Sequence, residues 1–363
     1  MINNDIHNAP TFILYGAGNT GRDVMALLRR KGKDVAFFLD AKAQPGMQVE
    51  GCPVYAPASI PPGKRQPELP VIVCIFNRDV DVLVIVEMLR AQGWRSVITF
   101  IEFHARHADS LGDRFWLSSP DVYERDSDRI AAVGQLWADE KSRILYRDML
   151  SSRCSGHVED MPRPSLGEIQ YFPSDVAGWL PHEPLRLTDI GAYDGDTLRA
   201  IASLGLSVEA YAAFEPDMDS FKKLCDATKH LLVTQNTTVN LWPCGVSSHA
   251  ELVTFACGLG ESSHVAPDGA GVSIPCVGLD EVLRGFRPNM IKMDIEGAEP
   301  QALTGAKDLL VENRPRLAIS IYHCPDHLWT IPLAVAELKC DYDLYMRVHG
   351  YNLLEVVLYA VPR

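Results

Sequence analysis

A short apolar run, a glycine-rich turn and an amphipathic helix follow one another at two places in this chain. The first place is Thr11–Tyr15 with the turn Gly16–Gly21, and the second is Leu185–Ile190 with the turn Gly191–Thr197. Glycine allows a tight turn between a strand and a helix and lets a ligand approach the backbone closely. Because strands and helices also alternate around both turns, we predict two parallel sheets.

Three regions of the chain differ in texture. Residues 1–105 alternate strands and helices, residues 106–183 have a charged helical period followed by prolines, and residues 184–363 alternate again. The sequence therefore predicts an α/β protein with two Rossmann-like, doubly wound domains joined by a helical connector and an extended lead-in. In the last region, five crossover strands and an antiparallel pair over residues 342–362 favour a class I methyltransferase sheet.

Local patterns predict individual elements. In the first half we expect a helix from about Thr20 to Lys31, a helix capped by Asp79 that runs to Gln92, and a long helix over Asp126–Leu150. In the second half we expect a strand over Val239–Val246. A β-hairpin is expected over Glu251–Val277, with Gly258–His264 as its glycine-rich tip.

Charge and cysteine content limit the function classes. The chain has 34 Lys and Arg against 47 Asp and Glu, a net charge of −13. An acidic chain has no general attraction for phosphate backbones, so we expect no nucleic-acid partner. We also expect no membrane span and a cytoplasmic location, because no apolar run approaches ~18 residues and Met1–Asp5 lacks a signal-peptide pattern. Nine cysteines without a CxxC pair read as reduced thiols.

Acidic residues close the first two strands of the C-terminal region. Asp189 is followed by the glycine turn, and Glu215 ends the next strand, 26 residues later. The helix N-terminus beyond the turn favours a carboxylate or phosphate, and Glu215 can accept both hydrogen bonds of a ribose diol. A turn with acids and no P-loop lysine suits a nucleoside without phosphates. S-adenosylmethionine (SAM) is such a ligand, with its amino group on Asp189 or Asp194.

Further acids follow a later strand and so reach the same edge of the sheet. Asp294 closes the strand that begins at Met290, and Glu296 and Glu299 come directly after it. These carboxylates could position a substrate hydroxyl or hold a divalent cation. Glu296 and Glu299 equally suit the capping of the following helix.

Two histidines lie where they could reach this edge. His323 follows the strand Arg316–Tyr322, and His349 lies in the terminal strand pair. Histidine is the side chain best suited to take a hydroxyl proton near neutral pH. Asp294 and His323 are therefore our candidates for catalytic residues.

Together these stretches resemble the FkbM-type family of SAM-dependent methyltransferases. The matching stretches are Asp189–Thr197, Ala213–Asp217, Val277–Asp280, Ile291–Glu299, Ile321–His323, Asp326–Trp329, Tyr345–His349 and Leu358–Ala360. The resemblance covers about residues 185–363. It implies the transfer of a methyl group from SAM, usually to a hydroxyl of a sugar, polyketide or other natural product.

The resemblance also implies roles for single residues. Asp189, Gly191 and Asp194 would line the methionine end of SAM and Glu215 its ribose, while Asp294 and His323 would face the acceptor. The cofactor-binding candidates are Asp189, Gly191, Ala192, Tyr193, Asp194, Gly195, Thr197, Glu215, Pro216 and Val246.

Two points concern additional ligands of this region. A divalent cation such as Mg²⁺ could be held by Asp294, Glu296 and His349, because hard cations prefer carboxylate oxygens. The sequence departs from many SAM enzymes after the third strand, where Cys244–Ser247 offers no acid to hold the adenine amino group.

The N-terminal region carries a dinucleotide-binding fingerprint. Gly16, Gly18 and Gly21 form a GxGxxG pattern, and Asp40 follows the last glycine by nineteen residues. NAD or a nucleotide sugar could bind there, as in the small Rossmann domains of sugar-modifying enzymes that this region resembles. Alternatively, the sheet has kept its turn and only docks onto the second domain. Residues 1–105 contain no catalytic Tyr-x-x-x-Lys pair.

Three function hypotheses follow from these patterns. The leading one is a SAM-dependent O-methyltransferase that acts on a hydroxyl of a sugar, polysaccharide precursor or natural product. The second is an NAD-dependent nucleotide-sugar oxidoreductase or epimerase, and the third is a non-catalytic nucleotide-sugar-binding protein. The expected partners are a small-molecule or glycan substrate, and a homo-oligomer could form.

Overall fold

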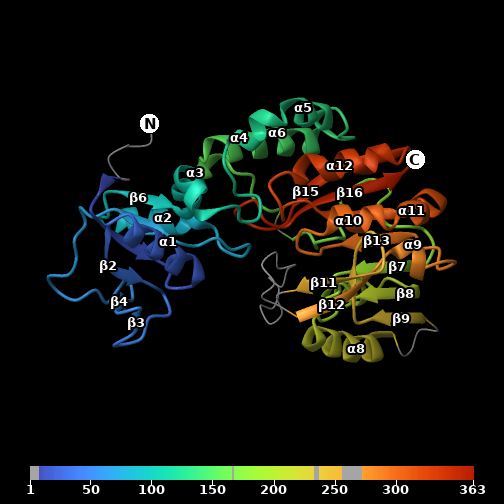
Figure 1. The fold of residues 1–363 in the computed structure, drawn as a ribbon, viewed down its shortest axis with the longest axis horizontal. Helices are drawn as coiled ribbons and strands as arrows, with labels where there is room; N and C mark the ends of the chain where they lie inside the picture. Colours follow the sequence, from blue (N-terminus) through green and yellow to red (C-terminus); the bar gives the residue numbers. More distant parts are fainter. Residues whose placement is uncertain (1–7, 166, 233–236, 256–271) are drawn as a thin grey trace. The chain divides into compact units, whose positions relative to one another are not determined.

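The chain folds into two compact units, each with its own parallel sheet (Figure 1). The computed structural model describes residues 8–165, 167–232, 237–255 and 272–363. The first unit comprises residues 1–125, 148–163 and 350–354, and the second comprises residues 126–147, 164–349 and 355–363.

The first unit has a six-stranded sheet in the order β3-β4-β2-β1-β5-β6. All its strand pairs are parallel except β3 with β4. The strands are β1 (Thr11–Tyr15), β2 (Asp34–Leu39), β3 (Gln48–Val49), β4 (Cys52–Tyr55), β5 (Val71–Val73) and β6 (Val97–Thr99). The predicted parallel sheet is therefore present in this unit.

Three helices follow strands of this sheet. They are α1 (Asn19–Arg30), α2 (Val82–Ala91) and α3 (Phe100–Leu111). The prediction that Asp79 caps α2 is wrong: the Asp81 side chain accepts the Leu83 N–H at 3.1 Å, whereas Asp79 lies in a turn closed by Asn77. Helix α3 begins directly after β6 because Thr99 and Glu102 form a capping box.

The single long helix expected over residues 126–150 is also wrong. Two helices stand there, α5 (Ser127–Gly134) and α6 (Glu140–Ser155), preceded by α4 (Asp121–Arg125). Between α5 and α6, the buried Trp137 pairs with Leu344 of a neighbouring strand, which the chain reaches only by leaving the helical conformation. None of the described helices has the length and apolar character needed to cross a lipid bilayer.

The second unit has a seven-stranded sheet in the order β15-β16-β14-β13-β7-β8-β9. The strands are β7 (Leu185–Ile190), β8 (Val208–Phe214), β9 (Thr238–Trp242), β13 (Met290–Met293), β14 (Arg316–Ser320), β15 (Tyr342–Val348) and β16 (Val356–Pro362). β15 and β16 form antiparallel pairs, and the other pairs are parallel. Five crossover strands and an antiparallel C-terminal pair confirm the predicted class I methyltransferase sheet.

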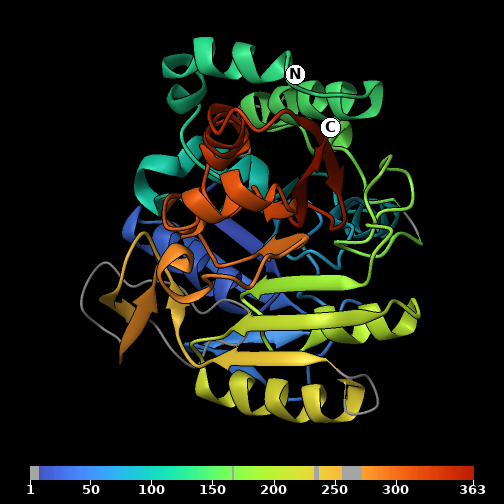
Figure 2. The ribbon, with the colours of Figure 1, turned by 90° about the vertical axis from the view of Figure 1, so that its right-hand side faces the viewer.

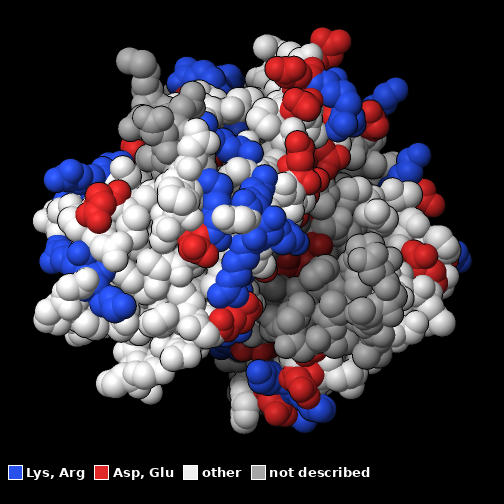
Figure 3. Space-filling view, turned by 60° about the vertical axis from the view of Figure 1, so that its left-hand side comes forward, with Lys and Arg blue, Asp and Glu red and all other residues white. Residues whose placement is uncertain are grey.

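The helices of this unit connect the parallel strands. They are α7 (Asp196–Ser203), α8 (Met218–Leu232), α9 (Leu279–Val282), α10 (Glu299–Thr304), α11 (Lys307–Asn313) and α12 (His327–Glu337). Figure 2 shows β7, β8 and β9 side by side, with α8 running along β9. On the face drawn in Figure 3, acidic and basic side chains of the described residues are interspersed.

A small second sheet follows β9, in the order β10-β12-β11. The strand expected over residues 239–246 is divided into β9 and β10 (Gly245–Val246), because Pro243 between them cannot donate a ladder hydrogen bond. β11 (Glu251–Phe255) and β12 (Val272–Val277) form the expected antiparallel pair. The predicted tip, Gly258–His264, lies outside the described residues.

A buried arginine binds two irregular segments to the edge of the seven-stranded sheet. Arg347 on β15 donates to Asp175 at 2.9 Å, to Asp139 at 2.7 Å and to the Ser142 hydroxyl at 3.0 Å. Its side chain is 4% exposed. Removal of one partner of a buried ion pair is strongly destabilising, because the remaining charge is left buried without compensation.

We therefore expect Arg347→Met to destabilise the second unit strongly. The substitution leaves Asp139 without its arginine and Asp175 with Lys141 alone, which we expect to lower the free energy of unfolding by about 3 kcal/mol. Urea unfolding followed by circular dichroism measures this change. Arg363→Met, which removes a solvent-exposed ion pair with Asp343, is the control and should change stability little. Equal stability of both variants would contradict the role of Arg347.

Candidate functional site

The carboxyl ends of β14, β13, β7 and β8 meet at one edge of the second sheet, because these strands are parallel neighbours. Asp189, Glu215, Asp294 and His323 lie at or just beyond these ends. Ligands of open α/β sheets bind at this edge. The structure thus brings the acids and the histidine that the sequence indicated to one side of the sheet.

The turn after β7 is pressed against the end of β13. Gly191 has a φ of +77°, and a Cβ atom there would lie 2.0 Å from the carbonyl oxygen of Asp294. Gly195 has a φ of +88° and caps α7, where a Cβ atom would lie 2.9 Å from Ala227. Both positions therefore require glycine for conformation and for space.

Asp189 lies in the interior, directly before this turn. Its side chain is fully buried, accepts a hydrogen bond from the Tyr211 hydroxyl at 2.9 Å, and lies 3.3 Å from the Lys292 ammonium group. Burial raises the pKa of Asp189, and the positive charge of Lys292 counteracts part of this effect. In this arrangement Asp189 presents no surface to a ligand. It is therefore not placed for the contact with the SAM amino group that we expected from the sequence.

Residues of the turn itself bind one another. The carboxylate of Asp194 pairs with Arg199, which also donates to the Asp194 carbonyl at 2.9 Å. The Thr197 N–H donates to Asp196 at 2.8 Å, and the Thr197 side chain is buried. Asp194 keeps surface available to a ligand, since about a quarter of its side chain is exposed, and Asp196 of the same turn is exposed as well.

Glu215 joins the turn to the end of β8. One carboxylate oxygen accepts the Tyr193 N–H at 2.8 Å, and the other accepts the Asp217 N–H at 2.8 Å. Burial raises the pKa of Glu215 to about 7, although these two backbone N–H groups lower it in part. In the ionised form of Glu215 each carboxylate oxygen keeps a lone pair for a further donor, which is what recognition of a diol requires. Pro216 directly follows Glu215, and Val246 is buried on β10.

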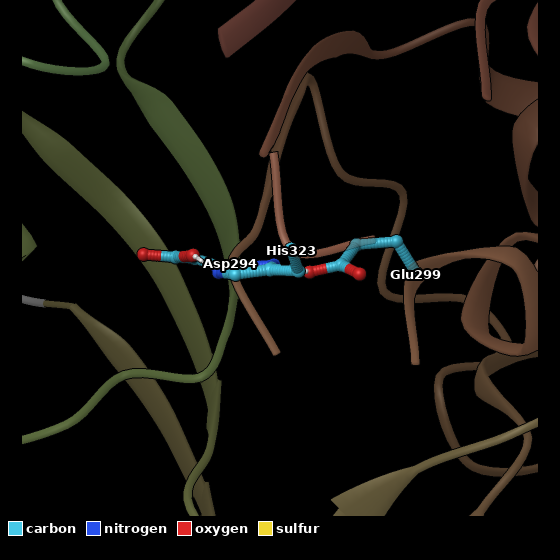
Figure 4. Close-up of side chains that lie close together, drawn as sticks. All are labelled: Asp294, Glu299 and His323. Atoms are coloured by element: carbon cyan, nitrogen blue, oxygen red, sulfur yellow. Dashed lines mark hydrogen bonds and ion pairs between the residues drawn. The ribbon is translucent and has the colours of Figure 1, made fainter. Parts of the chain in front are cut away.

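The imidazole of His323 lies between two carboxylates (Figure 4). Its Nδ1 is 2.7 Å from Glu299, and its Nε2 is 3.2 Å from Asp294. Burial alone would lower the pKa of His323, but the charge of Glu299 and the hydrogen bond with Asp294 raise it well above its ordinary value. A protonated imidazole donates through both nitrogens and has no lone pair to accept a hydroxyl proton. In this state His323 holds Asp294 in place rather than acting as a base.

Asp294 lies beside His323 and is partly exposed. Its other oxygen accepts a hydrogen bond from the Tyr171 hydroxyl at 2.7 Å, and 21% of its side chain is exposed. Burial would raise the pKa of Asp294, but His323 and Lys292 lower it far below its ordinary value. Asp294 therefore stays ionised at neutral pH and can accept a hydrogen bond from a ligand hydroxyl.

Glu299 anchors the group in the protein interior. Its fully buried carboxylate accepts the N–H groups of Ile295 at 2.9 Å and Gly297 at 3.1 Å. It also lies 3.5 Å from Nδ1 of His327. Glu299 thus binds the backbone that precedes α10 and orients His323, but it does not cap the helix, which has no side-chain cap hydrogen bond.

The expected metal site is not assembled as predicted. The described residues bring the ligand atoms of Asp294, Glu299 and His323 within 4.8 Å of one another. His349 does not belong to this group; its Nε2 is 2.8 Å from the Tyr359 hydroxyl, and burial lowers its pKa to about 4. The group that the structure brings together, Asp294, Glu299 and His323, therefore differs from the predicted set of Asp294, Glu296 and His349.

Glu296 differs from Asp294 and Glu299 in the direction of its pKa shift. Its backbone has a φ of +53°, and its carboxylate lies 3.8 Å from Nε2 of His323. Burial and the neighbouring acids Asp294 and Glu299 raise the pKa of Glu296 to about 8, although the charge of His323 acts in the opposite direction. Glu296 is therefore largely protonated at neutral pH in this arrangement.

The N-terminal GxGxxG fingerprint forms a turn between β1 and α1. Its acid, Asp40, accepts hydrogen bonds from nearby backbone N–H groups. One oxygen of Asp40 accepts the Ala17 N–H at 2.9 Å, and the other accepts the Lys42 N–H at 2.8 Å. A Cβ atom on Gly21 would lie 2.1 Å from the Gly16 carbonyl oxygen, so close packing of α1 on the turn explains this glycine. The space beside Gly18 is open.

Comparison with known proteins agrees with the geometry of the second unit. Residues 189–353 match the profile of the methyltransferase FkbM domain. This part of the chain is an FkbM methyltransferase domain. The crystal structure of methyltransferase FkbM from Methylobacillus flagellatus KT has a TM-score of 0.74 to this chain. The likeness covers 97% of this chain and 90% of that one at 18% identity, so the two share a fold over nearly their whole length.

Other solved structures resemble the chain less. Precorrin-6y C5,15-methyltransferase from Geobacter metallireducens GS-15 has a TM-score of 0.30 at 13% identity, over 50% of this chain and 81% of that one. Fibrillarin from Aeropyrum pernix also has a TM-score of 0.30, at 10% identity, over 49% of this chain and 67% of that one. Likenesses of this size carry no argument about function. No curated protein matches the sequence.

Two residues that contact the acids of the site do not follow from the sequence patterns. Lys292 lies in the middle of an apolar strand, and this unusual position is the signal that could have identified it. Tyr171 reaches Asp294 from the proline-rich lead-in, where no periodic pattern marks it. Both residues lie beneath the site and contact the acids that the sequence did identify.

The ion pairs around His323 make the stability of the FkbM domain depend on pH. The raised pKa of His323 contributes stability that is complete below pH 6.5 and is lost as the pH rises through the folded pKa. The lowered pKa values of Asp294 and Glu299 contribute stability that is lost as the pH falls below about 4.5. We expect the difference in unfolding free energy between the wild type and His323→Gln to be largest between these limits. A difference independent of pH from 4 to 10, in urea titrations, would contradict the charged state assigned to His323.

Proposed function

We propose that the protein transfers a methyl group from SAM to a hydroxyl group of a sugar, a polysaccharide precursor or another small natural product. The FkbM domain supports the methyl transfer. The observation that carries the choice of cofactor is the carboxylate of Glu215, which bridges the end of β8 and the Gly191 turn and keeps a lone pair on each oxygen. A ribose diol is the group that this arrangement fits.

The cofactor would lie along the edge formed by β7 and β8. The ribose would bind Glu215, and the methionine end would lie over the turn from Gly191 to Gly195, where Asp194 offers a carboxylate for the amino group. Ala192, Tyr193, Thr197, Pro216 and Val246 complete the proposed binding region. Asp189 contributes by holding the turn rather than by contact.

The acceptor would enter beside Asp294. SAM supplies a methyl group on a sulfonium that is already a good leaving group, so the protein has mainly to orient the acceptor oxygen for in-line approach. Orientation of this kind is worth roughly 7–11 kcal/mol. Asp294, held by His323 and Tyr171, accepts the hydrogen bond of the acceptor hydroxyl and so points a lone pair of the acceptor oxygen at the methyl carbon. As the O–CH3 bond forms and the S–CH3 bond breaks, the hydroxyl proton passes to the Asp294 carboxylate and from there to solvent, and S-adenosylhomocysteine is left.

Calorimetric titration with SAM tests the cofactor. We expect the wild type to bind SAM and Glu215→Ala to bind it at least about tenfold more weakly, because the ribose loses hydrogen bonds to a carboxylate. Glu209→Ala is the matched control, since Glu209 lies on the same strand at the opposite end, paired with Arg186. This control should bind SAM like the wild type.

Two results would contradict the proposed cofactor. One is no SAM binding by a folded wild type, which would remove SAM as the ligand of this edge. The other is equal affinity of Glu215→Ala and the wild type, which would remove Glu215 as the ribose acceptor. Titration of the same wild-type sample with NAD tests the alternative cofactor, for which we expect no binding.

Transfer of a labelled methyl group tests the role of Asp294. With radiolabelled SAM and a panel of glycosides and nucleotide sugars, we expect Asp294→Asn to lose about 100-fold or more in turnover, because an amide is a weaker acceptor for the hydroxyl. SAM affinity should stay within about twofold of the wild type. Asp226→Asn, an exposed position on α8, is the control for a lost charge. Wild-type turnover in Asp294→Asn would contradict the proposed role.

A further inference from the structure

A lysine is buried in the middle of the second sheet. Lys292 lies on β13 between Ile291 and Met293, and its side chain is 2% exposed. An ammonium group in the interior costs several kcal/mol unless its charge and its donors are satisfied. The partners of Lys292 therefore show which part of the structure the buried ammonium group stabilises.

Three segments converge on the ammonium group. Nζ lies 3.3 Å from the carboxylate of Asp189 on β7, donates a hydrogen bond to the carbonyl oxygen of Gly191, and lies 5.3 Å from the centre of the Tyr171 ring. The charge of Asp189 together with those of Asp294 and Asp196 keeps the pKa of Lys292 high, although burial acts against it. Lys292 is therefore a cation that is bound to the first residue of the turn.

The Gly191 turn is held from both sides by main-chain and side-chain bonds. On the β8 side, the N–H groups of Gly191 and Ala192 both donate to the Phe214 carbonyl at 3.0 Å. On the β13 side, the Gly191 carbonyl accepts from Lys292. An Asp189–Lys292 pair alone would need no such bond to the turn, so charge compensation does not account for all contacts of the lysine.

We propose that Lys292 is a positioning residue for the cofactor: its ammonium group holds the carbonyl of Gly191, and SAM affinity depends on it although it does not touch SAM. This inference rests on the proposed function, since it assumes that SAM binds over the Gly191 turn. The same lysine lies against the ring of Tyr171, whose hydroxyl donates to Asp294 at 2.7 Å. One buried cation thus contacts the supports of the cofactor side and of the acceptor side.

A purely structural role predicts different behaviour. If Lys292 served only to neutralise Asp189, removal of both charges together would restore stability and SAM affinity alike. If Lys292 positions the turn, the double substitution restores stability but leaves the Gly191 carbonyl without its donor. The two roles therefore separate when stability and affinity are measured on the same variants.

The experiment compares Lys292→Met, the double variant Lys292→Met with Asp189→Asn, and the wild type, all as full-length chains. Thermal unfolding gives the stability, and calorimetry with SAM as the probe gives the affinity. We expect Lys292→Met to be destabilised and the double variant to recover most of the lost stability. SAM affinity of the double variant should remain about tenfold or more below that of the wild type.

Met346→Ala is the control for a general loss of stability. Met346 is fully buried on β15, at the far edge of the sheet from the turn, so its truncation creates a cavity without touching the β7 end. We expect a lower melting temperature and a SAM affinity within about twofold of the wild type. A parallel loss of affinity in this variant would show that destabilisation alone weakens SAM binding, and would overturn the inference.

Hydrogen–deuterium exchange of the chain without SAM gives a second readout that does not depend on the cofactor. We expect peptides that cover residues 190–196 to exchange faster in the double variant than in the wild type. Unchanged exchange there, or wild-type SAM affinity in the double variant, would overturn the inference.

The outcomes also separate this inference from the proposed function. Failure of both variants to fold would overturn the inference, because Lys292 would then be required for the fold itself. A folded wild type that does not bind SAM would instead refute the proposed function, and the exchange measurement would still decide whether Lys292 holds the turn.

Discussion

The ion pair between Asp189 and Lys292 is the interaction on which the edge of the second sheet depends. It joins β7 to β13 in the interior, where an unpaired charge of either sign would be strongly destabilising. The fully buried pair places no charge in the region of a ligand. It fixes the start of the Gly191 turn, so the backbone over which a cofactor would lie is set before the cofactor arrives.

A second chain of charged groups holds Asp294, beside which we propose that the acceptor binds. Glu299 binds His323, His323 binds Asp294, and Tyr171 binds Asp294 from the other side. The result is an aspartate that stays ionised and cannot rotate freely, although part of it is exposed. The proposed methyl transfer from a sulfonium to a hydroxyl would need little chemical assistance, and a fixed hydrogen-bond acceptor for the incoming hydroxyl would help it most.

Much of this arrangement could be predicted from the sequence, because strand ends carry it. Apolar runs that end in Asp189, Glu215 and Asp294 indicate three neighbouring strands, and the parallel sheet then brings their ends together without further information. The FkbM resemblance rested on these same runs. Elements that depend on distant contacts were predicted less well. The break in the expected long helix arises from Trp137 packing beside Leu344, more than 200 residues later in the chain.

The side-chain partners could not be predicted at all. Whether Asp189 faces a ligand or the interior depends on which side of the strand it occupies and on Lys292 of another strand. The protonated state of His323 depends on Glu299. In the sequence, the need for an acid at a helix N-terminus would have been enough to explain a glutamate at position 299. His349, a candidate metal ligand by its position in the sequence, is instead bound to Tyr359. Such pairings come from tertiary packing, and no local pattern encodes them.

A crystal structure of the full chain with S-adenosylhomocysteine tests the account most directly. The account predicts the ribose hydroxyls on Glu215, the homocysteine end over the Gly191 turn, and the sulfur atom facing Asp294. An adenosine group bound elsewhere, or a ribose that makes no contact with Glu215, would contradict it.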